Sequence, residues 1–310
     1  MIPPAIAVHH LTRSYRSHTA LSDVTLAVPT GSVYALVGPN GAGKTTLIQL
    51  IMNLRQPTSG VAQVLDLPAS SIHGAILNRI GYVSENHEMP DWMTISELLD
   101  FLRPFYPTWD YALEQQLLRE FALPLDRQLG ELSRGMRVKT AFVSSLSYRP
   151  ELLVLDEPFS GLDPLMRDDL IQGLLDRIGE TTIFLSSHDL AEIESFASHI
   201  GYLESGRLLF SEELDSLSAR FRQVRFRPGS TVAPDSALPP SWLEVERSQS
   251  HCKFRDSSFC TPEQAIAQIR AAFPHASEIS FEPLSLREIF LTQARTSRVL
   301  RDLSAERAAQ

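Results

Sequence analysis

Val33-Tyr34-Ala35-Leu36-Val37 and the stretch that follows it, GPNGAGKTT at positions 38–46, decide the fold of this chain. The glycine-rich stretch fits the pattern G-x-x-x-x-G-K-[ST], which indicates a phosphate-binding loop when a buried strand precedes it and a helix follows. Both conditions are met, because residues 33–37 are apolar and the segment from Lys44 through Ile51 has helical spacing. Glycines let backbone N–H groups turn inward around a polyphosphate, and the helix N-terminus adds positive potential. The stretch therefore predicts that Lys44 reaches the β- and γ-phosphates and that the Thr45 hydroxyl lies on Mg²⁺.

The composition of the chain restricts its partners. It has 310 residues, 43% hydrophobic and 21% charged, which suits a globular protein of one large or two modest domains. A formal net charge of −9 argues against nucleic-acid binding and against direct insertion into anionic lipid. Two cysteines, Cys252 and Cys260, make no disulfide framework and favour a cytoplasmic location. The first residues do not resemble a signal peptide, and we expect no membrane-spanning segment.

Apolar strands alternate with helical segments along the first two thirds of the chain. Short apolar runs at 80–83, 152–155 and 181–185 read as strands, and Thr94-Ile95-Ser96-Glu97 is a capping box that opens a helix. Further helices are expected over 110–121, 164–178 and 189–196, and a hairpin over 200–210. This alternation predicts an α/β fold with a largely parallel sheet, interrupted by a helical stretch over about residues 90–147.

The pattern changes near Leu217. Val224 and Phe226 alternate with arginines, a stretch rich in Pro and Ser follows, and Thr261-Pro262 starts another helix. We therefore expect a small α+β domain over residues 218–310, separate from a first domain over 1–217. The arginines at 220, 222, 225 and 227 are better explained as a solvated strand face than as a binding patch.

Several polar residues follow the apolar runs at points where chemistry is expected. Asp156 and Glu157 end the run at 152–155, where an Asp can hold Mg²⁺ and a neighbouring carboxylate can polarise the attacking water. His188 follows the strand at 181–186 and could reach a γ-phosphate from there. Ser133 is a good N-cap for the helix that follows, and a helix start can hold an anion. Taken alone, Ser133 is better explained as an ordinary cap.

Taken together, these motifs resemble the nucleotide-binding subunit of ATP-binding cassette (ABC) transporters over roughly residues 5–210. GPNGAGKTT matches the family's phosphate loop, LSRGM at 132–136 its signature, and LLVLDEP at 152–158 its magnesium and catalytic-carboxylate strand. Ser160-Gly161-Leu162-Asp163 matches its D-loop and His188 its switch histidine, while Tyr15 lies where the family stacks an aromatic ring on adenine. The resemblance implies a P-loop NTPase fold of the ABC ATPase type, with a mostly parallel core sheet, an antiparallel β subdomain and an inserted helical subdomain.

The resemblance also implies a set of site residues and partners. Glu157, His188 and Lys44 would be catalytic, and Thr45, Glu85 and Asp156 would hold Mg²⁺. Two such chains would pair head to tail around two ATP molecules and drive a separate membrane permease, which would place the protein at the inner face of the cell membrane. The residues expected to bind ATP are Tyr15, Gly38, Pro39, Asn40, Gly41, Ala42, Gly43, Lys44, Thr45, Thr46, Ser133, Gly135 and Asp163.

Two departures from the family pattern stand out. Glu85 replaces the usual Gln, adding negative charge beside the phosphates, and Arg134 and Met136 replace Gly and Gln in the signature. We expect Glu85→Gln to remain active. The ending Leu284-Ser285-Leu286-Arg287-Glu288-Ile289-Phe290 resembles that of cassettes working with separate exporter-type permeases and favours export. Alternatives are a soluble cassette ATPase acting on ribosomes or DNA and a non-catalytic, nucleotide-gated regulator.

Overall fold

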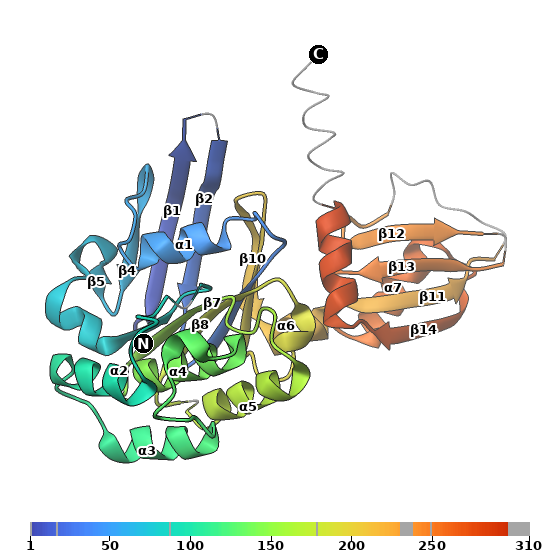
Figure 1. Cartoon of the computed structure of the whole chain (residues 1–310). Coiled ribbons are helices and arrows are strands. Elements are labelled where there is room, and N and C mark those ends of the chain that lie inside the picture. Colours follow the sequence, from blue (N-terminus) through green and yellow to red (C-terminus); the bar gives the residue numbers. More distant parts are fainter. Residues whose placement is uncertain are drawn as a thin grey trace. The chain divides into compact units, whose positions relative to one another are not determined.

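A mostly parallel sheet forms the centre of the N-terminal part of the chain (Figure 1). The computed structural model describes residues 2–16, 18–86, 88–177, 179–229, 238–248 and 250–296. The strand order in this sheet is β10-β9-β3-β8-β7-β6, and β6, β7, β8, β3 and β9 pair in parallel. The strands are β3 (Val33–Val37), β6 (Ile80–Val83), β7 (Leu152–Asp156), β8 (Thr182–Ser187), β9 (His199–Glu204) and β10 (Arg207–Glu213). Every residue of β3, β7 and β8 is buried, as expected for parallel strands covered on both faces.

A second, antiparallel sheet has the order β2-β1-β4-β5. Its strands are β1 (Ile6–Tyr15), β2 (His18–Val28), β4 (Ser59–Val64) and β5 (Leu67–Pro68). Its apolar face shares one core cluster with helix α1 (Lys44–Ile51), in which Ile6, Leu11, Leu47 and Ile51 are fully buried. This packing fixes the helix that leaves the glycine-rich loop.

Helices interrupt the parallel sheet between β6 and β7, as the sequence predicts. They are α2 (Ile95–Leu102), α3 (Tyr111–Glu120) and α4 (Arg134–Leu146), with the 3₁₀ turns Arg103–Phe105 and Leu129–Glu131 between them. The predicted capping box is present, because Thr94 accepts from Glu97 N and the Glu97 carboxylate accepts from Thr94 N. Other short 3₁₀ pieces cover Ala69–Ser71 and Gly74–Arg79, and α5 (Pro164–Leu175) follows β7.

One predicted helix is wrong. Residues 189–196 contain only a 3₁₀ turn, Leu190–Glu192, flanked by turns. Glu192 is buried, and its carboxylate accepts a 2.6 Å hydrogen bond from the Ser187 hydroxyl. The Asp189 side chain caps Ala191 N, and two backbone bonds of helical type follow, from Glu194 N to Leu190 O and from Ala197 N to Ile193 O. These isolated bonds do not form the continuous ladder of an α-helix.

The chain divides into two compact units, Met1–Ser211 and Glu212–Gln310. The predicted boundary after residue 217 lies inside α6 (Leu214–Arg220), which belongs to the second unit. The second unit contains an antiparallel sheet of order β12-β13-β11-β14, with helix α7 (Pro262–Ala272) and a helix over residues 286–296. Its strands are β11 (Arg222–Arg227), β12 (Trp242–Arg247), β13 (Cys252–Asp256) and β14 (Ser277–Pro283).

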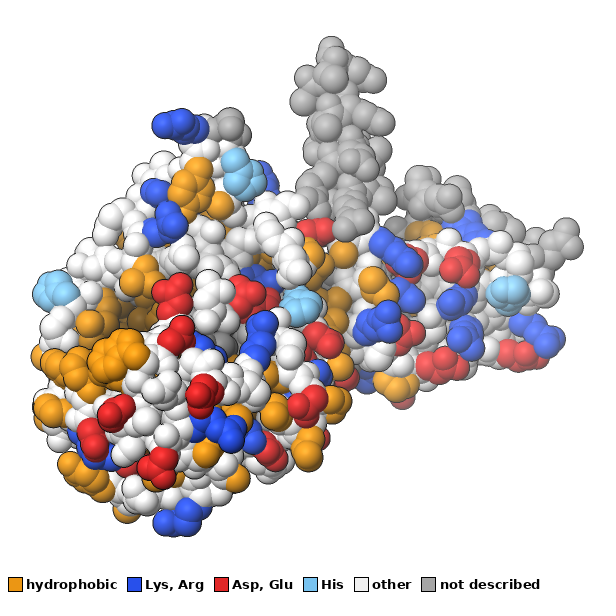
Figure 2. All heavy atoms as spheres, in the orientation of Figure 1, with side chains coloured by type: hydrophobic (Ala, Val, Ile, Leu, Met, Phe, Trp, Pro, Cys, Tyr) orange, Lys and Arg blue, Asp and Glu red, His pale blue; other side chains and the backbone are white. Residues whose placement is uncertain are grey.

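The four arginines at 220, 222, 225 and 227 are paired with acids or with backbone carbonyls. Arg220 contacts Glu212 at 2.6 Å, Arg227 contacts Glu278 at 2.8 Å, and Arg225 contacts Glu282 at 3.4 Å. Figure 2 shows acidic and basic side chains interleaved on the face of this unit that it presents. Arg225 and Arg227 are exposed on β11, as a solvated strand face requires, whereas Arg220 lies in α6 and Arg222 is half-buried and donates to backbone carbonyls. The mixed charge makes a poor surface for a polyanion.

Candidate active site

The glycine-rich loop connects the buried strand β3 to α1, the context that the sequence predicts. Two of its glycines cannot be replaced without displacing backbone. A Cβ on Gly38 would collide with the Leu203 carbonyl, and a Cβ on Gly43 would lie 2.6 Å from the Ala20 carbonyl oxygen. Gly43, the N-cap of α1, also has φ of 108°, which an L side chain rarely adopts. The loop is thus drawn tightly over the helix N-terminus, with its amides beside the positive end of the helix.

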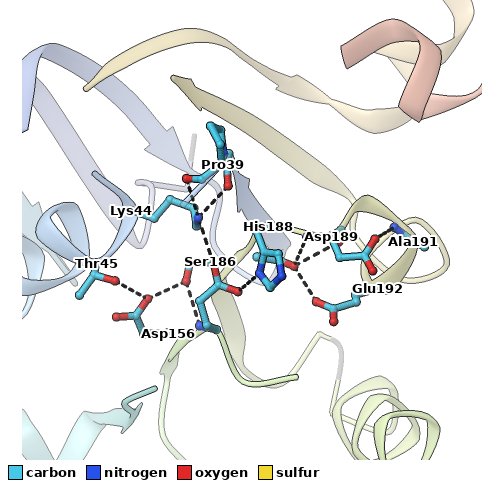
Figure 3. A network of polar contacts seen from close by, with 12 residues as sticks. Pro39, Lys44, Thr45, Asp156, Ser186, His188, Asp189, Ala191 and Glu192 are labelled. Carbon is cyan, nitrogen blue, oxygen red and sulfur yellow. Dashed lines mark hydrogen bonds and ion pairs between the residues drawn. The ribbon is translucent and has the colours of Figure 1, made fainter. Parts of the chain in front are cut away.

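The Lys44 side chain lies buried beneath this loop (Figure 3). Its ammonium donates to the carbonyl oxygens of Gly38 at 2.7 Å and Pro39 at 3.3 Å. It also forms an ion pair with Glu157, with 3.0 Å between Nζ and Oε1. The loop carbonyls therefore hold a full positive charge at the rim of the loop, next to a buried carboxylate.

Asp156 and Glu157 come from the end of β7, beside the ends of β3 and β8. Asp156 Oδ1 accepts hydrogen bonds from Ser186 Oγ at 2.7 Å and Thr45 Oγ1 at 3.2 Å. Burial raises the pKa of the Asp156 carboxyl, although both hydroxyls oppose that effect. The carboxyl ends of parallel strands meet at one edge, so residues more than a hundred positions apart converge here (Figure 3).

His188 completes this polar network from the end of β8. Its Nδ1 lies 2.8 Å from Glu157 Oε2, so one oxygen of Glu157 contacts His188 and the other contacts Lys44. The Glu157 backbone adopts a left-handed conformation, with φ of 50°, and its N–H donates to Ser186 Oγ at 2.9 Å. Strained backbone of this kind is found where a side chain must be aimed at a reacting group. The geometry can therefore orient a carboxylate as a proton acceptor.

A cavity of about 620 Å³ opens over this network and brings together most of the predicted site. Glu85 from the end of β6 and Tyr15 from the end of β1 line it with the loop. Gly38, Pro39 and Asp156 lie behind it, joined to it through Lys44 and Thr45. The predicted residues that line the cavity are Tyr15, Asn40, Gly41, Ala42, Gly43, Lys44, Thr45, Thr46, Glu85, Glu157 and His188.

Three further predicted residues, Ser133, Gly135 and Asp163, lie away from this cavity, and no hydrogen bond in the described part of the chain joins them to it through Lys44 or Thr45. Ser133 caps α4, accepting from Met136 N at 3.3 Å, and Gly135 lies in the first turn of that helix. Asp163 is exposed and caps α5, accepting from Met166 N at 3.0 Å. The start of α4 and the start of α5 meet at this point, because a Cβ on Gly135 would run into the Met166 side chain. These residues form a separate surface of the same unit.

Sequence reasoning missed other residues of the site. Ser186 links the Asp156 carboxylate to the Glu157 backbone, and His18 and Ala20 line the cavity. Ser160 lines it too, although the sequence indicated it only as part of the D-loop match. The one available signal was the serine pair at 186–187, which ends an otherwise apolar buried strand. Buried hydroxyls need partners, so their position beside β7 pointed to a polar contact.

Comparison with known proteins agrees with this geometry. The family model described as ABC transporter matches residues 21–160. The chain is 31% identical over 222 residues to the ABC transporter ATP-binding protein YtrB of Bacillus subtilis strain 168, covering 71% of this chain and 76% of that one. A solved structure of the ATP binding subunit of an ABC transporter matches with a TM-score of 0.62 and 30% identity, covering 69% of this chain and 91% of that one.

The chain therefore belongs to the family of ABC transporter ATP-binding proteins and is an ABC-type ATPase. The predicted fold and ATP-binding function are confirmed. Two further relatives are a daunorubicin/doxorubicin resistance ATP-binding protein, DrrA of Streptomyces peucetius, and a bacitracin transport ATP-binding protein, BcrA of Enterococcus faecalis. DrrA is 30% identical over 322 residues, covering 99% of this chain and 96% of its own. BcrA is 30% identical over 223 residues, covering 70% and 72%. No helix in the described part of the chain is long and apolar enough to span a membrane.

Proposed function

We propose that this chain binds ATP with Mg²⁺ in the cavity over the loop, and that ATP hydrolysis there drives a separate membrane permease, in the direction of export. The observation that carries the proposal is the contact series Lys44–Glu157–His188 at the rim of the loop. A buried lysine, a carboxylate and a histidine are joined where a γ-phosphate would lie. Export is supported by the similarity to DrrA and BcrA, whose names link them to drug resistance and to bacitracin transport.

The contacts of Lys44 suggest how substrate binding prepares the site for hydrolysis. In the structure, Glu157 is one partner of its ammonium. Triphosphate oxygens carry more charge than one carboxylate, so Lys44 exchanges Glu157 for phosphate when ATP binds. Glu157 then faces the cavity while His188 still holds its other oxygen. There it accepts a proton as water attacks the γ-phosphorus and the bond to the β-phosphate oxygen breaks.

The oxygen donors near Asp156 fit a magnesium ion. The Thr45 hydroxyl and the Asp156 carboxylate are 3.2 Å apart, and Glu85 lines the same cavity. Mg²⁺ prefers such oxygen ligands and binds through one or two carboxylates together with substrate phosphates. Bound there, the ion would neutralise charge on the β- and γ-phosphates. Tyr15, at the end of the cavity lined by β1, takes the adenine ring.

Ser133, Gly135 and Asp163 have a role in this proposal as donors to a second copy. They lie away from the chain's own cavity, at the starts of α4 and α5, where Ser133 and Asp163 are exposed and Gly135 is buried. A helix N-terminus offers free N–H groups and positive potential to an anion. In a head-to-tail homodimer, this surface of one copy closes the ATP site of the other, so ATP holds the pair together and hydrolysis releases it.

The permease would bind the helical insert, which carries exposed aromatic side chains. Trp92 is 70% exposed, Phe105 is 59% exposed and Phe101 is 54% exposed. Figure 2 shows hydrophobic side chains gathered over the region where α2 and α3 lie in Figure 1. Large exposed apolar groups that cluster in this way mark a protein interface. This contact would hold the chain at the cytoplasmic face of the membrane.

We also propose that the C-terminal unit is a separate domain.

The test compares the full-length protein with Glu157→Gln and with Glu194→Gln, an exposed acid that serves as the matched control. We expect phosphate release from ATP by the original chain and the control, and a loss of about 10²- to 10⁴-fold in Glu157→Gln, the range for removing a general base. The Glu157→Gln protein should form an ATP-dependent dimer in light scattering. Equal phosphate release by all three proteins would contradict the role assigned to Glu157. No phosphate release by any of them would favour a non-catalytic, nucleotide-gated regulator.

A second measurement addresses the partner. Tagged Glu157→Gln is expressed in its native cells, extracted with mild detergent in the presence of ATP, and analysed by mass spectrometry for co-purifying proteins. A polytopic membrane protein in near-stoichiometric amount is the expected result. Ribosomal or DNA-associated proteins without any membrane protein would instead support a soluble cassette ATPase.

A further inference from the structure

The Tyr15 ring has a cavity beside it and arginine side chains near it. It ends β1 and lines the cavity together with His18, its cross-strand partner in β2. The guanidinium carbon of Arg13 lies 4.4 Å from the centre of the Tyr15 ring, and that of Arg55 lies 5.7 Å from it. Neither arginine lines the cavity. Both guanidinium groups thus lie over the Tyr15 ring without belonging to the walls of the space that a base would enter.

Arg13 is held in this position by the fold. Residues 13 and 15 are two apart on one strand, so their side chains project from the same face. Arg13 Nη1 donates to the Gln56 carbonyl oxygen at 2.8 Å, in the segment between α1 and β4. The backbone around that segment is tied to β1 as well, because Thr58 N donates to Thr12 O at 2.8 Å and Ser14 N donates to the Thr58 hydroxyl at 3.0 Å. The guanidinium is thus fixed before any ligand arrives.

We infer that Arg13 is a positioning residue for the nucleotide base, acting through Tyr15; this inference rests on the proposed role of Tyr15. A cation over one face of an aromatic ring is attracted by the ring's negative face. It holds the ring in one orientation, so less side-chain freedom is lost when a base stacks on it. It also draws ring electron density away from the opposite face, which reduces repulsion between that face and an electron-rich purine.

Arg55 is the weaker of the two contacts. It is exposed, and its Nε donates to Gln49 Oε1 at 2.6 Å. At 5.7 Å from the ring centre it lies near the outer limit for a cation–π contact. Arg55 variants should therefore affect base binding less than Arg13 variants do. Arg16, one residue beyond Tyr15, is exposed. Arg16→Met removes the same charge as Arg13→Met, so it controls for the long-range attraction between an arginine and the phosphates.

The experiment measures ADP and pyrophosphate binding to the full-length protein by calorimetry, so that hydrolysis does not interfere. The variants are Arg13→Met, Arg13→Lys, Arg55→Met, Arg16→Met, Tyr15→Ala, and Arg13→Met combined with Tyr15→Ala. We expect Arg13→Met to weaken ADP binding about three- to tenfold, the range for a partly exposed cation–π contact. Pyrophosphate binding should change less than about twofold, because the ring contributes nothing to it. Arg13→Lys should restore most of the loss.

The double variant decides how Arg13 acts. In the Tyr15→Ala background, Arg13→Met should cause no further loss of ADP binding. Unchanged ADP binding in Arg13→Met, equal losses for ADP and pyrophosphate, or an undiminished Arg13 effect without Tyr15 would each overturn the inference. A failure of the proposed function has a different signature: Lys44→Ala would bind ADP as the original chain does, or Tyr15→Ala would leave the ratio of ADP to pyrophosphate affinity unchanged. Thermal melting checks that each variant is folded.

Discussion

Glu114 and Asp156 are both buried carboxylates in the N-terminal unit, yet their surroundings move their pKa values in opposite directions. Burial favours a raised pKa for both. At Glu114, hydrogen bonds from Arg103 and Trp109 overcome burial and hold the pKa below its usual value. At Asp156, the partners are the hydroxyls of Ser186 and Thr45, and burial prevails, so the pKa is raised. One carboxylate is fully paired by the fold, and the other is not.

The difference separates a structural network from a site that awaits a ligand. The Arg103 guanidinium bonds both oxygens of Glu114, at 2.7 and 2.8 Å, and Trp109 Nε1 adds a third bond at 2.7 Å. Nothing in that arrangement calls for a further cation. Asp156 lies beside a second acid, Glu157, and a cavity opens over them. Burying a carboxylate whose pKa is raised costs stability, and such a cost is retained where function requires it.

The largest expected effect is on catalysis at Asp156. Asp156→Asn keeps an oxygen that can accept from Ser186 and Thr45 but removes the negative charge beside the proposed magnesium position. We expect turnover to fall about 10²- to 10³-fold, the loss typical of removing one electrostatic contact to a transition state. Steady-state phosphate release with varied Mg²⁺ is the measurement. Full activity of Asp156→Asn at low Mg²⁺ would show that the Asp156 carboxylate is not needed for magnesium binding or catalysis.

Replacing Glu114 should have the opposite effects, with a large loss of stability and little change in nucleotide binding. Glu114→Gln leaves the half-buried Arg103 without its main partner, and we expect a loss of about 3 kcal/mol in the free energy of unfolding. Urea unfolding at pH 7 measures it. Glu120→Gln, on the exposed side of the same helix α3, is the matched control and should change stability by less than about 0.5 kcal/mol. Similar losses of stability in Glu114→Gln and Glu120→Gln would show that the buried pairing of Glu114 does not stabilise the fold.

Replacing Asp156 should stabilise the protein in the absence of nucleotide and metal. Because burial raises the pKa of its carboxyl, the ionised form is disfavoured in the folded state. Asp156→Asn is therefore expected to raise the free energy of unfolding at pH 7 by on the order of 1 kcal/mol, as when buried charges are replaced by neutral groups. A variant that loses both activity and stability would indicate that Asp156 supports the fold in the way Glu114 does.

The pH dependence of Glu114 provides a smaller and more specific test. Its pKa is lowered in the folded state, so its contribution is complete above the unfolded pKa, about 4.3, and declines as the pH falls through the folded value. The stability difference between the original chain and Glu114→Gln should be constant from pH 6 to pH 8 and shrink below about pH 4. A difference that grows on acidification would mean that the carboxylate is not stabilised by its partners.

The same contrast explains what could be predicted from the sequence. The loop at 38–46, the Thr94–Glu97 capping box and the apolar strands depend on residues near one another in the chain, and each is present as predicted. The bonds that join Glu157 to His188 and Ser186 to Asp156 depend on strand order, which local patterns do not specify. A local signal could mislead as well, since residues 189–196 have helical spacing but form only a turn.

Glu114 shows how a missed contact could have been found. It lies between the buried Leu113 and Leu117 in α3, so a charged residue occupies the apolar face of a predicted helix. Such a position requires a buried partner, and Arg103 is the cation at the end of the preceding helix. Sequence alone could therefore indicate that a partner exists. Which arginine supplies it follows only from how α2 and α3 pack.

Glu85 should show the smallest effect, and it tests whether every acid at the cavity behaves like Asp156. It lines the nucleotide cavity, and it also lines a second cavity of about 310 Å³ together with Arg134 and Arg137. A glutamine at this position keeps an oxygen that can reach the same metal, so removing the charge is expected to change little. We expect Glu85→Gln to alter turnover by less than about threefold, whereas a loss comparable to that of Asp156→Asn would place Glu85 among the indispensable metal ligands.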